Sequence, residues 1–466
     1  MKRSVGCADL LALPPLADAV GISVADVELT GELGLWRGPF AVDDVAVSSA
    51  VVALSAAAEL LAERNGQPRA AITLDVRHAA ASFLSDALVE PIGWELPPVW
   101  DSIAGDYRTM DGWIRLHTNY AHHREAALSA LDIDPFADVE PSAVAAAVAN
   151  WPGDDLESAV VGNGGAAARQ RSREDWDLHD AGISARSEPL LEVVIDDGGG
   201  RRFGPCQRPF DGVRVLDLTR VLAGPTATGF LAAWGADVLR IDPPDFREVP
   251  AVVPVTTCGK RTAVLDLRTE LGRQRFLELL ATADVVVHGY RSDALAALGL
   301  DPSEWRQIRP GLVDVSLSAY GQRGPWATRR GFDSLVQHSS GITSYAQMVA
   351  GADRPIPLPC QALDYGTGWL LAAAVASGLV RRCRTERGTS AKTSLARFAA
   401  LVTALPANVD PSRRPPTVAD FGPYLTIAQT AWGPLQRLPW PGVIGQLRPL
   451  LGASHEIGSH APEWQP

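Results

Sequence analysis

The chain has 466 residues, a formal net charge of -12 and 46% hydrophobic residues. This length and apolar content allow one large core or two smaller ones. The negative charge argues against nucleic acid or an anionic membrane as the main partner. Five widely separated cysteines, without a CxxC pair or a nearby histidine cluster, predict neither a disulfide framework nor a metal site. A reduced, cytoplasmic setting is the one they favour.

The chain shows no pattern typical of export or membrane insertion. Its basic start, "MKRSVGCADLLALPPLADAVG", is interrupted by Asp9, two prolines and Asp18 before a signal-like core forms. The longest apolar run, residues 369–380, is little more than half of the ~20 residues that span a bilayer. We therefore expect no membrane partner.

Residues 1–200 predict a smaller α+β unit. An alanine-rich helix is expected over 45–64 and another over 75–88, followed by a hairpin over 107–119 with Asp111-Gly112 as its turn. Polar, helical segments continue to about residue 190. Glycine, proline and paired charges then cluster over 196–212, and we place a linker at 201–212.

Residues 213–466 predict a doubly wound α/β domain. Short β-branched runs at 213–219, 236–242, 261–268, 284–290 and 311–321 read as strands. Helical spacing separates them over 227–235, 270–283 and 293–300. Apolar strands that alternate with helices form a parallel sheet covered on both faces, as in Rossmann-like folds.

Several cations lie at predicted strand ends or in loops of this domain: Lys260, Arg261, Arg291, Arg329 and Arg330. The turn at 220–229 follows the first strand and opens a helix, where α/β folds bind phosphates. It lacks the GxGxxG pattern, so a nicotinamide dinucleotide is not indicated. Gathered at one sheet edge, the cations would suit a phosphorylated cofactor, but each also fits an ordinary solvated loop charge.

Asp364 stands at the start of an alanine-rich helix in "LPCQALDYGTGWLLAAA". It could be the N-cap of that helix and accept an N–H from Gly366 or Thr367. It could also be a nucleophile that attacks a thioester, with Gly366 and Gly368 leaving room for the substrate and exposed N–H groups holding the oxyanion. The residues alone do not choose between these roles.

An internal similarity connects the two halves of the chain. Aligning Asp44 with Asp364 without gaps also places Arg64 on Arg384 and Thr73 on Thr393. Alanine-rich helices match by chance easily, so the similarity alone is weak evidence for a duplication.

Three segments together resemble the family III CoA-transferases, the CaiB/BaiF group, which includes formyl-CoA transferase, carnitine CoA-transferase and α-methylacyl-CoA racemase. The first is "RVLDLTRVLAGPTATGFLAAWGADVLRIDPP" at 214–244. The second is the block from "GKRTAVLDLRTELGRQ" to "HSSGIT" at 259–343, and the third is "ALDYGTGWLLAAAVASGLVRRCRTERGTSAKTSL" at 362–395. They agree with the family in order and spacing over about 210–400.

The resemblance implies a function and a set of site residues. Asp364 falls on the family's nucleophile, which takes an acyl group from acyl-CoA as an anhydride, then carries CoA as a thioester to an acceptor carboxylic acid. Coenzyme A is thus expected as part of the substrate, without a metal, and the family's homodimer is expected too. The positions implied to contact CoA are Leu222, Ala223, Lys260, Arg261, His288, Gly289, Tyr290, Arg291 and Arg330.

The chain also departs from the family pattern. Segments 107–134 and 151–179 resemble the family's small domain, which normally follows the aspartate helix. We therefore interpret residues 1–200 as a partial family copy, with a worn aspartate helix and the small domain placed first. Asp44 has Ala46 and Ser48 where Gly366 and Gly368 stand, so we expect it to be inert.

Two alternatives to CoA transfer stay open. One is a 2-methylacyl-CoA racemase, but Phe332 stands where racemases carry a basic histidine, and His338 lies six residues further on. The other is a catalytically inactive CoA-binding member of the family.

Overall fold

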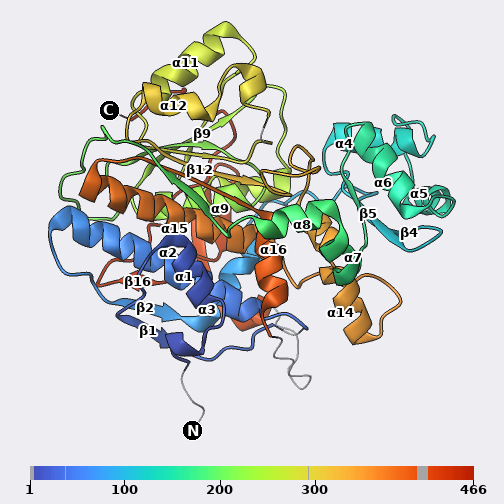
Figure 1. Cartoon of the computed structure of the whole chain (residues 1–466), viewed down its shortest axis with the longest axis horizontal. Helices are drawn as coiled ribbons and strands as arrows, with labels where there is room; N and C mark the ends of the chain where they lie inside the picture. The colour runs from blue at the N-terminus through green and yellow to red at the C-terminus, as the bar shows by residue number, and fades with distance from the viewer. Residues whose placement is uncertain (1–4, 37, 292, 407–417, 466) are drawn as a thin grey trace.

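The computed structural model describes residues 5–36, 38–291, 293–406 and 418–465. A seven-stranded sheet with the order β10-β9-β8-β11-β12-β13-β7 forms its centre (Figure 1). The strands are β10 (Arg261–Val264), β9 (Asp237–Asp242), β8 (Arg214–Leu218), β11 (Val285–His288), β12 (Val313–Ser318), β13 (Thr389–Ser394) and β7 (Glu192–Ile195). Every pair is parallel except β13 and β7. The predicted α/β class, with a mostly parallel sheet, is confirmed.

Alternate strand residues face two different cores, as the period of two in a strand requires. Val215, Val285 and Val313 share a core with helices α9 (Ala223–Ala233) and α15 (Ala362–Thr385). Leu216 and Val286 belong to a second core with α11 (Glu270–Leu280) and α12 (Pro302–Ile308). Figure 1 shows α11 and α12 on one side of the sheet and α15 on the other. Both faces are thus covered, which explains the near-continuous apolar strands.

The N-terminal residues pack on the α15 side. Helices α1 (Leu13–Val20) and α2 (Val42–Asn65) belong to the same core as α15, and α2 lies beside α15 in Figure 1. Strands β1 (Val27–Thr30), β2 (Ile72–Asp75) and β16 (Val443–Ile444) form a separate three-stranded sheet, and α3 (Val76–Ala81) follows β2. Both α2 and α15 are long and apolar enough to cross a bilayer, but 83% and 100% of their most apolar windows are buried inside the protein.

A smaller α+β unit lies to one side of this body (Figure 1). Its sheet has β4 (Gly105–Arg108), β5 (Trp113–Leu116) and β6 (Ala167–Arg169), and α4 (Ala121–Ala130), α5 (Pro141–Val148) and α6 (Gly153–Gly162) pack on it around their own core. The predicted hairpin is confirmed, because Arg108 pairs with Trp113 across the Asp111-Gly112 turn.

The remaining elements connect these parts. Helices α7 (Arg173–Leu178) and α8 (Asp180–Ser187) lead into β7. Helices α10 (Val253–Thr256), α13 (Asp333–Ser339), α14 (Ile342–Ala350) and α16 (Leu395–Ala404) complete the large body. Strands β14 (Thr426–Thr430) and β15 (Gly433–Arg437) pair with β3 (Val89–Pro91) in a third small sheet.

Three expectations need correction. The helix expected over 293–300 is only a 3-10 turn, Ala296–Leu298, because Gly299 adopts a left-handed conformation with φ 72°. The helix expected over 75–88 ends at Ala81 and continues as a 3-10 turn, Ser82–Leu84. Residues 1–200 do not form one α+β unit, because α2 shares the main core and β7 joins the main sheet. The linker at 201–212, as the boundary between a partial family copy and the large domain, stays a prediction.

Candidate active site

A cavity of about 420 Å³ opens where β8, β11 and β12 end. Its walls come from the segments that follow these strands, from the start of α15 and from the start of α4. Parallel α/β sheets bind ligands at the carboxyl ends of their strands, since loops and helix N-termini converge there. The residues that line it include Tyr120, His122, His123, Arg220, Val221, Ala223, Gly224, Phe246, Gly289, Tyr290, Arg291, Arg329, Arg330, Phe332 and Asp364.

Asp364 is the third residue of α15, and 7% of its surface is exposed, toward the cavity. The N-cap of α15 is Gln361, so Asp364 does not hold the N-cap position. The helix end is held instead by Asp333 at the start of α13, whose Oδ2 accepts the Asp364 N–H at 2.9 Å. Across the described ranges, no hydrogen bond to the Asp364 carboxylate is recorded. Its oxygens are therefore available to a ligand.

Burial and the neighbouring acid groups both disfavour the Asp364 anion. Burial raises the pKa of Asp364 well above its ordinary value, and the charges of Asp333 and Asp86 raise it further. Burial also raises the pKa of Asp333, to about 6, although Gln337 and the backbone N–H groups of α15 oppose the rise. Ionisation of Asp364 thus requires positive charge close to its carboxylate.

Three arginines line the same cavity. Arg220 lies 3.7 Å above the Phe246 ring and donates to the Tyr290 hydroxyl at 3.3 Å. Arg291 and Arg330 donate to the carbonyl oxygens of Thr328 (3.4 Å) and Gly164 (3.1 Å). No carboxylate partner is recorded for these three among the residues that the structure describes. Their guanidinium groups can therefore bind phosphate or carboxylate oxygens.

The first residues of α9 line the same space. Helix α9 begins at Ala223, and its N-cap, Leu222, provides no side-chain hydrogen bond. Ala223 and Gly224 both line the cavity. N–H groups of a first helical turn have no partner within the helix, and they favour negative charge. They can stabilise an oxyanion that forms beside Asp364.

The small α+β unit contributes residues that sequence reasoning missed. Tyr120, His122 and His123 line the cavity from the start of α4. Burial lowers the pKa of His123 to about 2, so this imidazole is neutral. His117 stacks on Phe332 with the ring centroids 3.7 Å apart. The resemblance of residues 107–134 to the family's small domain was the available signal, but it did not place these side chains.

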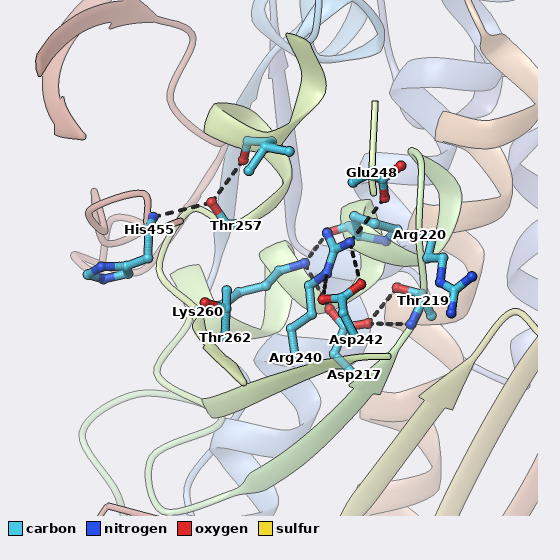
Figure 2. Close-up of polar contacts among 12 residues, drawn as sticks. Asp217, Thr219, Arg220, Arg240, Asp242, Glu248, Thr257, Lys260, Thr262 and His455 are labelled. Atoms are coloured by element: carbon cyan, nitrogen blue, oxygen red, sulfur yellow. Dashed lines mark hydrogen bonds and ion pairs between the residues drawn. The ribbon is translucent and has the colours of Figure 1, made fainter. Parts of the chain in front are cut away.

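Lys260 does not line the cavity, although the resemblance implied a CoA contact. Its Nζ is buried and donates to Asp217 Oδ2 at 3.0 Å (Figure 2). It also donates to Thr228 Oγ1 at 2.6 Å and to Pro225 O at 3.1 Å. The side chain runs beneath α9, where the Asp217 carboxylate neutralises it. Lys260 is therefore a core residue.

Arg261, His288 and Leu222 also lie outside the cavity lining. Arg261 is at the amino end of β10 and pairs with Asp237, at the amino end of β9, at 2.8 Å. His288 ends β11, but it is buried with Nε2 3.5 Å from Asp314 Oδ1. Leu222 faces a separate cavity of about 40 Å³. Of the implied CoA contacts, the structure brings Ala223, Gly289, Tyr290, Arg291 and Arg330 to the cavity.

Gly366 and Gly368 make room for helices rather than for a thioester. A Cβ at Gly366 would lie 2.3 Å from Phe398 Cε1, on α16. A Cβ at Gly368 would lie 2.4 Å from Ala223 O, on α9. The missing side chains thus let α16 and α9 approach α15 closely, which corrects the role expected from the sequence.

Asp44 occupies in α2 the same position that Asp364 occupies in α15, the third of the helix. Its carboxylate accepts the N–H groups of Leu11 and Ala12, each at 2.7 Å, and the Ser48 hydroxyl at 3.2 Å. It therefore holds the start of α1 and has few oxygen lone pairs left for chemistry. Among the described residues, no group of three or more His, Cys, Asp or Glu side chains could hold a metal ion.

Comparison with known proteins finds relatives for one part of the chain. Residues 210–416 match the model of CoA-transferase family III. The chain is 35% identical over 190 residues to the probable fatty acyl-CoA transferase Rv3272 of Mycobacterium tuberculosis, covering 38% of this chain and 48% of that protein. It is 34% identical over 198 residues to the succinate–glutarate CoA-transferase of Agrobacterium fabrum, covering 39% and 49%.

The match with a solved structure covers only part of each chain. The crystal structure of Rv3272 superimposes with a TM-score of 0.40 at 34% identity, covering 42% of this chain and 56% of that chain. The chain spans about half the length of the curated relatives that it matches. Residues 210–416 of the chain are thus similar to CoA-transferase family III.

Proposed function

We propose that this protein transfers CoA from an acyl-CoA donor to a carboxylic acid, with Asp364 as the nucleophile. The observation that carries the proposal is the Asp364 carboxylate, which has no recorded hydrogen-bond partner among the described residues and faces a cavity with three arginines that lack a recorded acidic partner there. The family match of residues 210–416 supports it.

The reaction uses the carboxylate twice. An Asp364 oxygen attacks the thioester carbonyl, so that a mixed anhydride forms and the CoA thiolate leaves. The thiolate attacks the aspartyl carbonyl, which releases the donor acid and forms an aspartyl-CoA thioester. The acceptor carboxylate then attacks this thioester, and the thiolate returns to the new acyl carbonyl. Atoms and charge balance without a metal or a redox cofactor.

The surrounding groups have separate tasks in this proposal. The N–H groups of Ala223 and Gly224 stabilise the oxyanion of each tetrahedral intermediate. Arg291 and Arg330 bind CoA phosphates, and a bound CoA positions the thioester against Asp364. Tyr120, His123 and Phe332 line the part of the cavity that is left for the acyl group. Named relatives act on succinate, glutarate and oxalate, so small carboxylic acids are the first substrates to try. The homodimer and the cytoplasmic location stay predictions.

Covalent trapping tests the proposal. The protein is incubated with a panel of acyl-CoA donors and quenched with hydroxylamine, and the modified peptide is identified by mass spectrometry. We expect modification at Asp364 and none in Asp364→Ala. Asp44→Ala is a matched control, because Asp44 is also the third residue of a long apolar helix, and it should keep the Asp364 adduct. Modification elsewhere, or an adduct that survives in Asp364→Ala, would contradict the mechanism.

Racemisation of a 2-methylacyl-CoA is the second candidate, because His122 and His123 line the cavity together with Asp364. His338, the base considered from sequence, is buried and bound to Ser334 O and Asp106 instead. An imidazole with a pKa of about 2, as burial gives His123, is a weak base for removing an α-proton. Solvent deuterium at the substrate α-carbon without an Asp364 adduct would favour the racemase. Neither signal, together with CoA binding, would favour an inactive binder.

A further inference from the structure

The turn between β8 and α9 contains a strained residue. Val221 has φ 63°, in the left-handed region. The other non-glycine residues with positive φ in the described ranges are Asp26, Asp132 and Glu386. Aspartate tolerates this region, and Glu386 is the C-cap of α15, but a β-branched residue there is a genuine outlier. Such strain persists only where surrounding contacts impose it, and it gathers at functional sites.

One buried carboxylate holds this strained residue. Glu248 Oε2 accepts the Val221 N–H at 2.9 Å and Arg240 Nη2 at 3.0 Å. Its Oε1 accepts the Tyr120 hydroxyl at 2.9 Å and the Val249 N–H at 3.0 Å. The Glu248 and Arg240 side chains are fully buried. A carboxylate with four donors around it is fixed in place, because moving it would leave several buried groups without a partner.

A second carboxylate anchors the guanidinium that orients Glu248. Arg240 binds Asp242 through two hydrogen bonds, Nε to Oδ2 at 2.8 Å and Nη2 to Oδ1 at 3.0 Å. Figure 2 shows Arg240 between Asp242 and Glu248, next to the Asp217 and Lys260 pair. These charged groups lie beside the turn that carries Arg220 (Figure 2). A rigid support of this kind is what a first-turn N–H donor needs in order to stay in position.

Glu248 also connects the two sides of the cavity. Val221 and Tyr120 both line it, one from the large body and one from the small α+β unit. Tyr120 lies 128 residues from Glu248 in the chain, and Val221 lies 27 residues from it. The same carboxylate thus fixes the loop before α9 and the phenol opposite.

We propose that Glu248 is a positioning residue for the reaction: it holds Val221 in the left-handed conformation so that the first N–H groups of α9 meet the oxyanion formed at Asp364. This inference rests on the proposed function. Glycine adopts the left-handed conformation without a steric cost, so a glycine at position 221 should need Glu248 much less. The two residues should therefore be coupled in catalysis.

A double-mutant cycle tests the coupling. The rate of Asp364 adduct formation and the dissociation constant of CoA are measured for the wild type, Glu248→Gln, Val221→Gly and the double variant. Loss of one charge-assisted hydrogen bond corresponds to about a tenfold slower adduct for Glu248→Gln. We expect Val221→Gly to restore at least about threefold of this loss in the Glu248→Gln background, and not to accelerate the wild type. Glu63→Gln, which removes a surface carboxylate paired with Arg384, is the control.

The outcomes separate this inference from the proposed function. Equal effects of Val221→Gly in both backgrounds would overturn the positioning role, even with a normal Asp364 adduct. Tyr120→Phe removes only the donor to Glu248 Oε1, so the hydrogen bond from Val221 to Oε2 stays. Rescue of Tyr120→Phe by Val221→Gly would therefore overturn the positioning role too. If Glu248→Gln does not fold, Glu248→Asp retains the charge beside Arg240 but withdraws the carboxylate from Val221, and the same cycle applies. If the wild type forms no adduct, the proposed function fails and this inference fails with it, because no oxyanion then forms at Asp364.

Discussion

Replacing Gly368 by alanine would test how the site is built. Gly368 lies in the second turn of α15, and an added Cβ would lie 2.4 Å from Ala223 O and 2.7 Å from Thr226 Cβ. Real Cβ atoms essentially never approach other atoms closer than 3.0 Å, so something must move. The nearest atom is a backbone oxygen in the first turn of α9, and it can yield only if α9 shifts away from α15.

The expected cost follows from two opposing effects. Inserting a methyl group into a close-packed core costs about 1–3 kcal/mol. Alanine in place of glycine inside a helix returns about 1 kcal/mol. Because the obstacle is backbone, we place Gly368→Ala toward the upper end, at about 2 kcal/mol net destabilisation. Gly366→Ala meets the Phe398 ring, a side chain that can rotate, and should cost less.

Urea unfolding followed by circular dichroism measures these changes, and adduct formation at Asp364 measures the effect on the site. Gly162→Ala is the matched control, because Gly162 also lies in a helix and its added Cβ would meet nothing within 4 Å. It should be neutral or slightly stabilising. If Gly368→Ala keeps wild-type stability but loses the adduct, the packing argument is wrong, and the glycine makes room for substrate as the sequence suggested.

Three further predictions follow from the same geometry. Folding raises the pKa of Asp333 and Asp364, so the stability that these groups contribute is complete below their ordinary pKa of 3.8. That stability is lost as the pH rises through about 6 for Asp333. Asp364→Asn should therefore make the fall in the urea midpoint between pH 4 and 7 shallower, whereas adduct formation by the wild type should rise with pH. Lys260→Met leaves the Asp217 charge buried without its partner and should lower the free energy of unfolding by about 3–5 kcal/mol. Arg261→Ala breaks a partly exposed pair and should lower it by about 1 kcal/mol or less. The affinity of the Arg261→Ala variant for CoA should not change. Asp44→Asn should lower stability by about 1 kcal/mol through the start of α1 and leave the adduct rate unchanged, and a lost adduct would refute its structural role.

The sheet could be predicted because its strands carry their own signal. Runs such as Val285-Val286-Val287 are β-branched and buried on both faces, and they read as parallel strands without knowledge of their neighbours. The turn before α9 could be placed for the same reason, since it follows such a run. The helix predicted over 293–300 is wrong because its alanines and leucines fit a helix, while Gly299 ends it after one turn.

Side-chain partners could not be predicted, because they depend on contacts between distant segments. Lys260 is a loop cation by sequence, but its partner Asp217 lies 43 residues earlier, under α9. Arg261 is its neighbour in sequence, yet it lies at the amino ends of β10 and β9, opposite the strand ends that form the cavity. His123 enters the cavity from a unit with its own core, far from Asp364 in the chain. Charge at a strand end therefore indicates a site only when the edge and the partner are both known.

The two long helices explain why one aspartate is available and the other is not. Helix α2 begins at Val42 and ends at Asn65, α15 begins at Ala362 and ends at Thr385, and the offset between them is the same at both ends. Gly66 and Glu386 end the two helices in the same left-handed conformation. The aspartates are thus equivalent in local structure, and helix position alone cannot give either of them reactivity.

What differs is the surroundings of the two carboxylates. Beside α15, Asp333 accepts the Asp364 N–H, so the Asp364 side chain has no structural task and faces the cavity. Beside α2, the Asp44 side chain accepts the N–H groups of Leu11 and Ala12, just before α1. Availability for chemistry therefore depends on whether a neighbouring segment binds the carboxylate. Replacing Asp333 by asparagine should consequently weaken the start of α15 and lower the pKa of Asp364 at the same time, since a like charge is removed beside it.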